Sequence, residues 1–366
     1  MAGSILGNIF KISTWGESHG KAVGVVIDGC PAGLDLCEDD IQTFLDRRKP
    51  GTSQFTTPRK ENDEVEILSG VFEGKTTGTP ISLLVYNKEQ RSTDYSEIAS
   101  YYRPGHADYT FDAKYGFRDY RGGGRSSGRE TIGRVAAGAI AIKILDRLGI
   151  RINAYSKEIG GISIDYSRFD AKECNNNPFY MPDSVAAAAI KDFAAQKRAE
   201  GDSVGGVIEC VIKGVMPGVG ETVFEKLDAN LAKAIMSIGA CKGFEIGDGF
   251  EVSKSLGSTN NDSFTVNDGK LDKKTNHAGG ILGGMADGSD IVFRAAFKPT
   301  PSISKLQRTV NKSMEEIDVS IRGRHDPMVV PRAVVVVESM AAITLVDLIF
   351  MNMTSKMDEI VSFYKR

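Results

Sequence analysis

The sequence predicts an α/β fold in a single domain spanning residues 1–366, with an internal pseudo-symmetry between its two halves. Three observations support this prediction. Strand-like and helix-like segments alternate along the chain, a short glycine–proline turn recurs in each half, and no segment between the halves has the composition of a linker. A chain of this length can bury a large core without disulfides or metals.

In the first half, apolar runs predict strands at residues 10–12, 23–27, 65–72 and 80–86. A helix is expected over residues 38–47, because acidic residues begin it and basic residues end it, as the helix dipole favours. Residues 87–125 form a long, polar stretch that we expect to be irregular, and loops of that length inside a compact domain are usually functional. A second helix is expected over residues 129–148.

The second half repeats this order. Helices are expected at residues 184–199 and 227–238 and a strand at 204–213. The turn GVMPG at 214–218 follows that strand much as GCPAG at 29–33 follows the strand at 23–27. Residues 323–351 again place a loop with arginine and glycine before an apolar helix. An internal duplication would explain these similarities.

The most apolar segment, residues 333–353, contains Glu338 and Asp347. These charges favour a strand that continues into a buried helix over a membrane span. The net charge of −3 excludes a basic field over the whole molecule, so we expect neither nucleic acid nor a membrane as partner. Any anion site must therefore be a local cluster of arginines and lysines.

Cysteine usage indicates a reducing compartment. The five cysteines form no CxxC pair, and their odd number favours reduced, mostly buried thiols. The first twenty residues lack a basic segment followed by an apolar one, so no signal peptide is expected. We therefore expect a cytoplasmic protein.

Glycine and histidine point to a site. The 40 glycines make up about 11% of the chain against an average of about 7%, and they are concentrated in short loops. Each of the four histidines, His19, His106, His277 and His325, lies in such a loop. A single histidine is more often structural, but four in glycine-bearing loops favour function. Their spacing matches no metal site, so no metal is expected.

The segment RGGGRSSGRE at 121–130 combines three adjacent glycines with arginines and serines. Ser127 and Glu130 have the spacing of a capping box, which predicts a helix start there. A helix start with nearby arginine and serine side chains suits a phosphate group. An ordinary glycine loop before a capped helix is the alternative, although four arginines exceed what capping needs: Arg121, Arg125, Arg129 and Arg134.

Other patterns are less specific. The segment GVFEGKT at 70–76 has three residues between its glycines where a P-loop needs four, and the triple glycine does not fit GxGxxG. FKPTPS at 297–302 could be a rigid loop or a ligand loop, and RRK at 47–49 could serve only to end a helix. Taken together, the residues indicate an enzyme for a small, anionic, phosphorylated substrate.

Six segments, in this order along nearly the whole chain, resemble the signature segments of the chorismate synthase family. They are GESHG at 16–20, RPGHADYT at 103–110, RGGGRSSGRET at 121–131, HAGGILGG at 277–284, FKPTPS at 297–302 and GRHDP at 323–327. The resemblance implies an α+β sandwich in which helices lie between antiparallel-rich sheets, assembled as a homotetramer.

The resemblance also implies a reaction, the last step of the shikimate pathway towards aromatic amino acids. The lyase would remove phosphate and a ring proton from 5-enolpyruvylshikimate 3-phosphate by anti-1,4-elimination, giving chorismate. The family requires reduced FMN (FMNH2) although the reaction has no net redox change. The proton leaves an unactivated carbon, so an electron-rich flavin can help to expel phosphate and accept the proton, while the protein orients the two.

Residue roles follow from matching positions. His106 resembles the acid that protonates the departing phosphate, His19 the group that controls protonation of the reduced flavin, and Asp326 the aspartate that assists proton transfer. The family's FMN contacts match Arg125, Ser126, Ser127, Gly239, Ala240, Gly283, Lys298, Pro299, Thr300, Pro301, Ser302 and Arg324. Candidates for the substrate's phosphate and two carboxylates are Arg48, Arg103, Arg129 and Arg134. His277 is expected to shape the flavin loop without a catalytic role.

Two positions depart from the family pattern. Gln54 stands where many members have a second arginine, for which Arg47, Arg59 or Lys60 could compensate, and Gly239 stands where asparagine is common. The sequence leaves open whether the chain reduces flavin with NADPH, although an external flavin reductase is expected. An FMN-dependent oxidoreductase and a non-catalytic binder of phosphorylated metabolites remain as alternatives.

Overall fold

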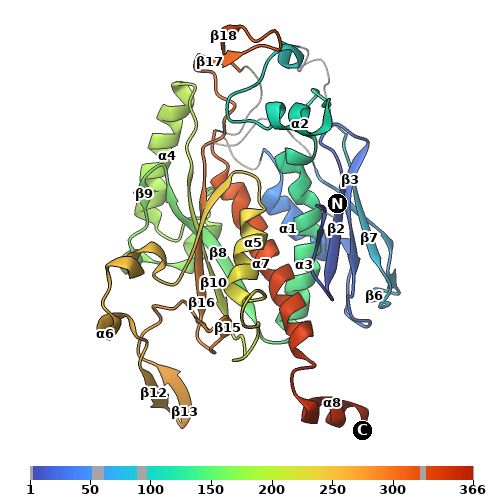
Figure 1. Cartoon of the computed structure of the whole chain (residues 1–366), viewed down its shortest axis with the longest axis vertical. Coiled ribbons are helices and arrows are strands. Elements are labelled where there is room, and N and C mark those ends of the chain that lie inside the picture. Colours follow the sequence, from blue (N-terminus) through green and yellow to red (C-terminus); the bar gives the residue numbers. More distant parts are fainter. Residues whose placement is uncertain (1–2, 52–61, 89–96, 322–326, 366) are drawn as a thin grey trace.

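The computed structural model describes residues 3–51, 62–88, 97–321 and 327–365. Two five-stranded antiparallel sheets lie on either side of a layer of helices (Figure 1). The first sheet has the order β1-β2-β3-β7-β4 and the second has the order β11-β16-β10-β8-β9. The predicted arrangement of helices between antiparallel-rich sheets is therefore confirmed.

The strands of the first sheet are Ile5–Leu6, Lys11–Gly16, Ala22–Asp28, Ile81–Tyr86 and Val65–Ser69, in sheet order. Those of the second are Cys241–Ile246, Ile291–Phe297, Gly206–Lys213, Arg151–Ile159 and Ile162–Ser163. Strand β16 buries alternate residues, namely Ile291, Phe293, Ala295 and Phe297, and Ile208, Cys210 and Ile212 of β10 are fully buried. This period of two is the pattern expected of a sheet with one face on the core.

Four helices form the middle layer: α1 (Glu38–Arg48), α3 (Thr131–Arg147), α5 (Leu227–Met236) and α7 (Val330–Asn352). Helix α3 packs on β2 and β3, α7 packs on β8 and β10, and the two helices pack against each other. Their axes approach closely at Gly138, where an added Cβ would lie 2.2 Å from the Ser339 Cβ.

Helix α7 corrects one prediction. The segment that begins at Ala333 was expected to start as a strand, but α7 is helical from Val330 onwards. Its valines are buried on all sides between the sheets, and tertiary packing overrides their preference for strands. The helix is long and apolar enough to cross a membrane, but 83% of its most apolar window is buried inside the protein.

The two halves of the chain repeat one another. The order β2-β3-β7-β4 in the first sheet corresponds to β8-β10-β16-β11 in the second, with α1 and α5 in equivalent places and α3 and α7 following. The hairpin β5–β6 (Val71–Phe72, Lys75–Thr76) likewise matches β14–β15 (Ile281–Leu282, Met285–Ala286). The glycines that precede these hairpins, Gly70 and Gly280, both have φ of +81°. The predicted pseudo-symmetry is confirmed.

The remaining helices and strands lie outside the two large sheets and the helix layer. The helices are α2 (Asp108–Tyr115), α4 (Ser184–Ala199), α6 (Gly257–Asn260) and α8 (Met357–Tyr364), and the strands form the hairpins β12–β13 (Phe264–Asn267, Lys270–Lys273) and β17–β18 (Gln307–Val310, Glu316–Val319). Short 3-10 helices lie at Glu97–Ser100 (η2), Gly124–Ser126 (η3), Gly128–Glu130 (η4), Tyr166–Arg168 (η5), Ala171–Asn175 (η6) and Gly249–Lys254 (η7).

The stretch 87–125 is less irregular than predicted, because it contains α2, which ends at Gly116 with φ of +79°. The main hydrophobic core includes Ile27 of the first sheet, Phe293 of the second and the helices between them. This continuity supports our proposal that residues 1–366 form one domain.

Candidate active site

Most of the predicted site residues that the structure describes lie at one end of the helix layer, where α3 begins and where α5 and β16 end. In Figure 1 this is the upper end of the core, beneath α2 and the β17–β18 hairpin. The first turn of a helix of this length carries unpaired N–H groups and a partial positive charge. The location therefore suits an anionic ligand.

His19 lies in a turn that follows β2, here called the His19 turn (residues 16–20). The Asn87 side-chain amide donates hydrogen bonds to the carbonyls of Glu17 (3.0 Å) and Gly20 (2.8 Å) in this turn. The His19 ring lies against Gly122, where an added Cβ would be 2.3 Å from the ring Cδ2. The first of the three adjacent glycines is therefore needed for close approach to the histidine, and the sequence pattern alone did not give this reason.

Charged groups surround the His19 turn. The hydrogen bond from Arg121 is the main cause of the lowered pKa of Asp119, and the positive charge of His19 acts in the same direction. The Ser18 hydroxyl is buried and has no hydrogen-bond partner within the described part of the chain. A buried hydroxyl of this kind normally has a partner, so it is available to a ligand or a water molecule.

Arg125 holds the glycine-rich segment against β2. Its guanidinium donates to the Thr14 hydroxyl (2.7 Å) and to the carbonyls of Thr14 and Gly16 (both 3.1 Å). The predicted capping box is only half formed: the Ser127 hydroxyl accepts from the Arg129 N–H at 3.3 Å. The Glu130 carboxylate instead accepts from Thr14 of β2 (2.8 Å) and Arg134 of α3 (2.7 Å).

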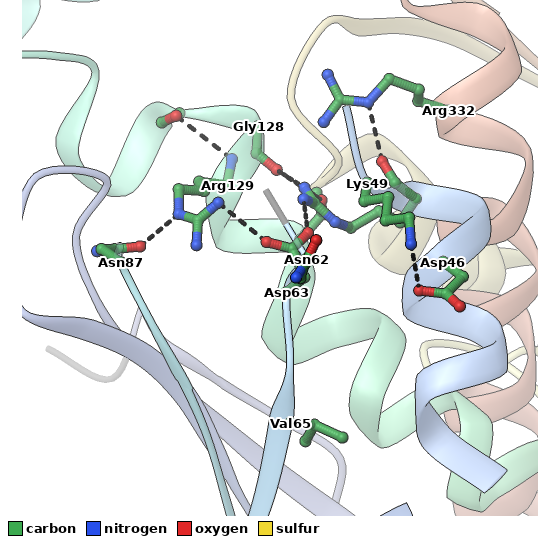
Figure 2. Close-up of polar contacts among 12 residues, drawn as sticks. Asp46, Lys49, Asn62, Asp63, Val65, Asn87, Gly128, Arg129 and Arg332 are labelled. Atoms are coloured by element: carbon green, nitrogen blue, oxygen red, sulfur yellow. Dashed lines mark hydrogen bonds and ion pairs between the residues drawn. The ribbon is translucent and has the colours of Figure 1, made fainter. Parts of the chain in front are cut away.

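Two of the candidate substrate arginines share one carboxylate (Figure 2). The Asp63 side chain is fully buried and pairs with Arg48 and with Arg129, the latter at 3.1 Å. Arg48 also donates to the Gly128 carbonyl at 3.2 Å. Arg129 donates through Nε to the Asn87 amide oxygen. The Arg48 side chain is 2% exposed and that of Arg129 is 11% exposed, so Arg129 is the more accessible of the two.

Arg134 connects α3 to the end of α5. It pairs with Glu130 and donates to the Ser237 hydroxyl at 2.6 Å. Gly239 and Ala240 follow directly, and Ala240 has φ of +69°. The Ala240 carbonyl accepts from the Lys298 backbone N–H at 2.9 Å, which joins this segment to the FKPTPS loop.

His106 faces the same loop. Its Nε2 lies 2.8 Å from the Ser302 hydroxyl and its Nδ1 lies 3.0 Å from the Pro104 carbonyl. The Lys298 ammonium donates to the Gly105 carbonyl at 2.7 Å, and burial, together with the charge of Lys242, lowers its pKa. Lys298 thus lies beside the backbone of the segment that carries His106.

Arg103 begins this segment and pairs with Asp108 through two hydrogen bonds of 2.8 and 2.7 Å. Both side chains are buried. Burial tends to raise the pKa of Asp108, but the hydrogen bonds and charge of Arg103 outweigh it, so the pKa lies below its ordinary value. The loop is therefore held in shape by a buried ion pair, and both of these guanidinium donors are occupied.

The structure does not bring every predicted residue together. Gly283 lies in the β14–β15 hairpin, near the start of β16, whereas Lys298 follows the end of that strand. His277 also lies near the start of β16, with its Nδ1 2.6 Å from an Asp248 oxygen. Other candidates lie outside the described residues: Gln54, Arg59, Lys60, Arg324, His325 and Asp326.

Comparison with known proteins gives the family. The family model described as chorismate synthase matches residues 10–350. The chain is 74% identical to the chorismate synthase of Lachnospira eligens over all of both chains, and 55% identical to that of Methanosarcina mazei, over 95% of this chain and 96% of that protein. A crystal structure of chorismate synthase superposes with a TM-score of 0.77 at 31% identity and covers 98% of this chain and 97% of its own.

The chain belongs to the chorismate synthase family. It is therefore an enzyme of a family that eliminates phosphate. The loops that carry His19 and His106 both belong to the signature segments that resemble this family. They do not identify the buried partners that orient the arginines.

Those partners are Asp63, Asn87 and Asp108, which sequence reasoning did not select. A weak signal existed for Asn87, because it directly follows the buried strand β7 at the start of the long polar stretch. Polar residues at the ends of strands often contribute to sites. Asp63 has φ of +49°, an uncommon backbone conformation that the sequence does not reveal.

The described residues fit the flavin that the family resemblance implies. At Gly124, Gly128 and Gly239, no described residue other than the chain neighbours has an atom within 4 Å of where a Cβ would be, so their backbone is open to a ligand. Arg125 directly follows Gly124, and Lys298 is joined through its backbone N–H to Ala240, the residue after Gly239. This combination of open backbone and cations suits a phosphate-bearing, planar cofactor.

Proposed function

We propose that this protein is a chorismate synthase that uses FMNH2 to eliminate phosphate from 5-enolpyruvylshikimate 3-phosphate, giving chorismate. One observation carries the proposal. Polar contacts lead from Arg125 through Glu130 and Arg134 to Ser237, and three residues further along the chain the Ala240 carbonyl accepts from the Lys298 N–H. The proposed flavin contacts and the His106 loop are thereby joined at the start of α3.

The substrate has a phosphate and two carboxylates, and four arginines are proposed to bind it: Arg48, Arg103, Arg129 and Arg134. Each of them is paired with a carboxylate of the protein, which fixes the plane of the guanidinium. A guanidinium has five N–H donors, so it can keep such a pair and still bind a ligand. Arg129 and Arg134, the more exposed pair, are the first contacts that we propose.

His106 is proposed to protonate the departing phosphate. The Pro104 carbonyl can only accept, so Nδ1 carries a hydrogen when the two are bonded. In that tautomer Nε2 of the neutral ring accepts a hydrogen bond from the Ser302 hydroxyl. When the ring is protonated, Nε2 carries a proton that can be transferred. The acid would therefore act from Nε2, on the side of the loop that carries Lys298.

His19 and Asp326 are proposed to hold and move a proton at the flavin. The flavin contacts that we propose are Arg125, Ser126, Ser127, Gly239, Ala240, Lys298, Pro299, Thr300, Pro301, Ser302 and Arg324. When bound, reduced FMN supplies electron density that assists loss of phosphate and a site for the ring proton. Gly283 lies near the start of β16, whereas Lys298 follows its end. We therefore propose Gly283 as a flavin contact only through another subunit of the proposed homotetramer.

We further propose a cytoplasmic enzyme that depends on an external flavin reductase, with NADPH as the source of electrons. An anaerobic assay with reduced FMN and the phosphorylated substrate tests the proposal. Phosphate and chorismate should form without net oxidation of the flavin. Stoichiometric flavin oxidation would instead indicate an oxidoreductase, and binding without turnover would indicate a non-catalytic binder.

A further inference from the structure

Asn87 contacts both the His19 turn and Arg129. It directly follows β7, and its backbone N–H donates to the Lys21 carbonyl at 3.0 Å, which fixes its position beside that turn. Both hydrogens of its amide point to carbonyls of the turn, those of Glu17 and Gly20. Its amide oxygen accepts the Nε hydrogen of Arg129 (Figure 2).

The orientation of this amide is set by chemistry. Carbonyl oxygens can only accept, so the side facing Glu17 and Gly20 must be the NH₂ group. A guanidinium can only donate, so the side facing Arg129 must be the oxygen. Neither aspartate nor a hydroxyl residue could make all three contacts, because aspartate lacks the two donors and a hydroxyl has only one.

Arg129 is held at a second point by Asp63, whose carboxylate lies 3.1 Å from Nη1. Asp63 in turn pairs with the buried Arg48, whose carbonyl accepts from Arg332 of α7 at 2.9 Å. The guanidinium is therefore fixed on one side by a buried carboxylate that is tied to α1 and α7. Asn87 connects its other side to the His19 turn.

We infer that Asn87 is a positioning residue that couples Arg129, as a substrate contact, to the orientation of His19. The inference rests on the proposed function, since it takes Arg129 to bind the substrate and His19 to manage a proton. When an anion binds Arg129, the guanidinium and the amide that it contacts are ordered together. The turn that carries His19 is then ordered by the same two hydrogen bonds from Asn87.

Two variants separate the two contacts of Asn87. Asn87→Asp keeps an acceptor for Arg129 but loses both donors to the His19 turn, and Asn87→Ser is too short to keep either contact. Asn267→Asp makes the same chemical change on the exposed β12–β13 hairpin and is the matched control. Equal thermal stability of the variants and the unchanged protein would exclude unfolding as the cause of any effect.

Asn87→Asp should bind the phosphorylated substrate, measured by calorimetry without reduced flavin, nearly as tightly as the unchanged protein. Its kcat should fall by about 10- to 100-fold, the usual scale for loss of a residue that orients a reacting group. Asn87→Ser should lose both affinity and kcat. An unchanged kcat in Asn87→Asp, or identical losses in the two Asn87 variants, would overturn the inference.

Amide hydrogen exchange tests the coupling without turnover. In the unchanged protein, the substrate should slow exchange in the His19 turn, including the Gly20 amide that donates to Glu17. In Asn87→Asp the substrate should still bind but no longer slow that exchange. Equal slowing in both proteins would refute the coupling. If exchange behaves as expected but the unchanged protein does not turn over the substrate, the result would count only against the proposed reaction.

Discussion

His106 and Ser302 lie 196 positions apart in the sequence, yet their side chains are hydrogen-bonded. Signature motifs identified both residues, but a motif specifies neither the contact nor its geometry. The same holds for the arginines: their types and positions could be read from the chain, and their partners Asp63 and Asp108 could not. The Asp63–Arg129 pair joins segments 66 positions apart, so it depends on the fold, whereas Asp108 lies five positions from Arg103 and only the geometry of their loop was missing.

Replacement of His106 tests the proposed acid. His106→Ala should leave FMN binding close to that of the unchanged protein, because the other proposed flavin contacts remain. Phosphate release should slow by about 10²- to 10⁴-fold, the usual contribution of general acid–base catalysis. His277→Ala is the matched control, since His277 pairs with Asp248 near the other end of β16. Near-normal turnover in His106→Ala would remove this residue from the mechanism.

At the scale of elements, caps and dipoles predicted helix limits well. Helix α1 was expected at residues 38–47 and spans Glu38–Arg48, and α4 begins at Ser184 and ends at Ala199 as predicted. The strand expected at 65–72 is divided at Gly70 into β4 and β5, because the chain turns there with φ of +81°. Strands β8 and β16 were not predicted, since their apolar pattern is not distinctive without the partner strands beside them.

The close packing of α3 on α7 predicts sensitivity at Gly138. An added Cβ would lie 2.5 Å from the Ser339 Cα, so Gly138→Ala requires the backbone of α7 to move. We expect the free energy of unfolding to fall by about 1–3 kcal/mol, as for other overpacked cores. Gly257→Ala, where no described residue outside its own helical turn lies within 4 Å of the added Cβ, is the control and should have little effect. Chemical denaturation of both variants measures the difference, and equal stabilities would contradict this packing.

Asp183 predicts an acid-dependent contribution of α4. Its buried carboxylate caps the helix through the Val185 and Ala186 N–H groups and pairs with Arg168 at 2.7 Å. The hydrogen bond from Arg168 is the main cause that holds its pKa far below the ordinary 3.8. The carboxylate therefore stabilises the fold fully above about pH 4, and this contribution is lost as the pH falls towards the folded-state pKa.

Asp183→Asn should therefore be less stable than the unchanged protein at pH 7, and the difference should shrink as the pH is lowered from 4 towards 2. Denaturant titrations across that range measure it. The control is Asp192→Asn, which removes the same charge from an exposed position on the same helix and should show no such trend. A difference that stays constant with pH would contradict the assigned role of Asp183.

At the scale of the whole molecule, repeated turns predicted the pseudo-symmetry because each turn ends an equivalent strand. The sandwich itself came from the family resemblance, since periodicity alone does not say which faces of the helices meet which sheet. The repeat also places the starts of α3 and α7 in equivalent positions in the two halves, and α7 contributes Arg332 to the contacts around Arg48. The starts of α3 and α7, which are equivalent in the repeat, thus both contribute residues to the same candidate site.

The most direct test of this account is the stoichiometry of a single anaerobic turnover. The protein is mixed with reduced FMN and 5-enolpyruvylshikimate 3-phosphate, and phosphate, chorismate and flavin absorbance are followed together. We predict equal amounts of phosphate and chorismate, with the flavin fully reduced at the end. Phosphate release accompanied by an equal amount of oxidised flavin, or no release at all, would contradict the account.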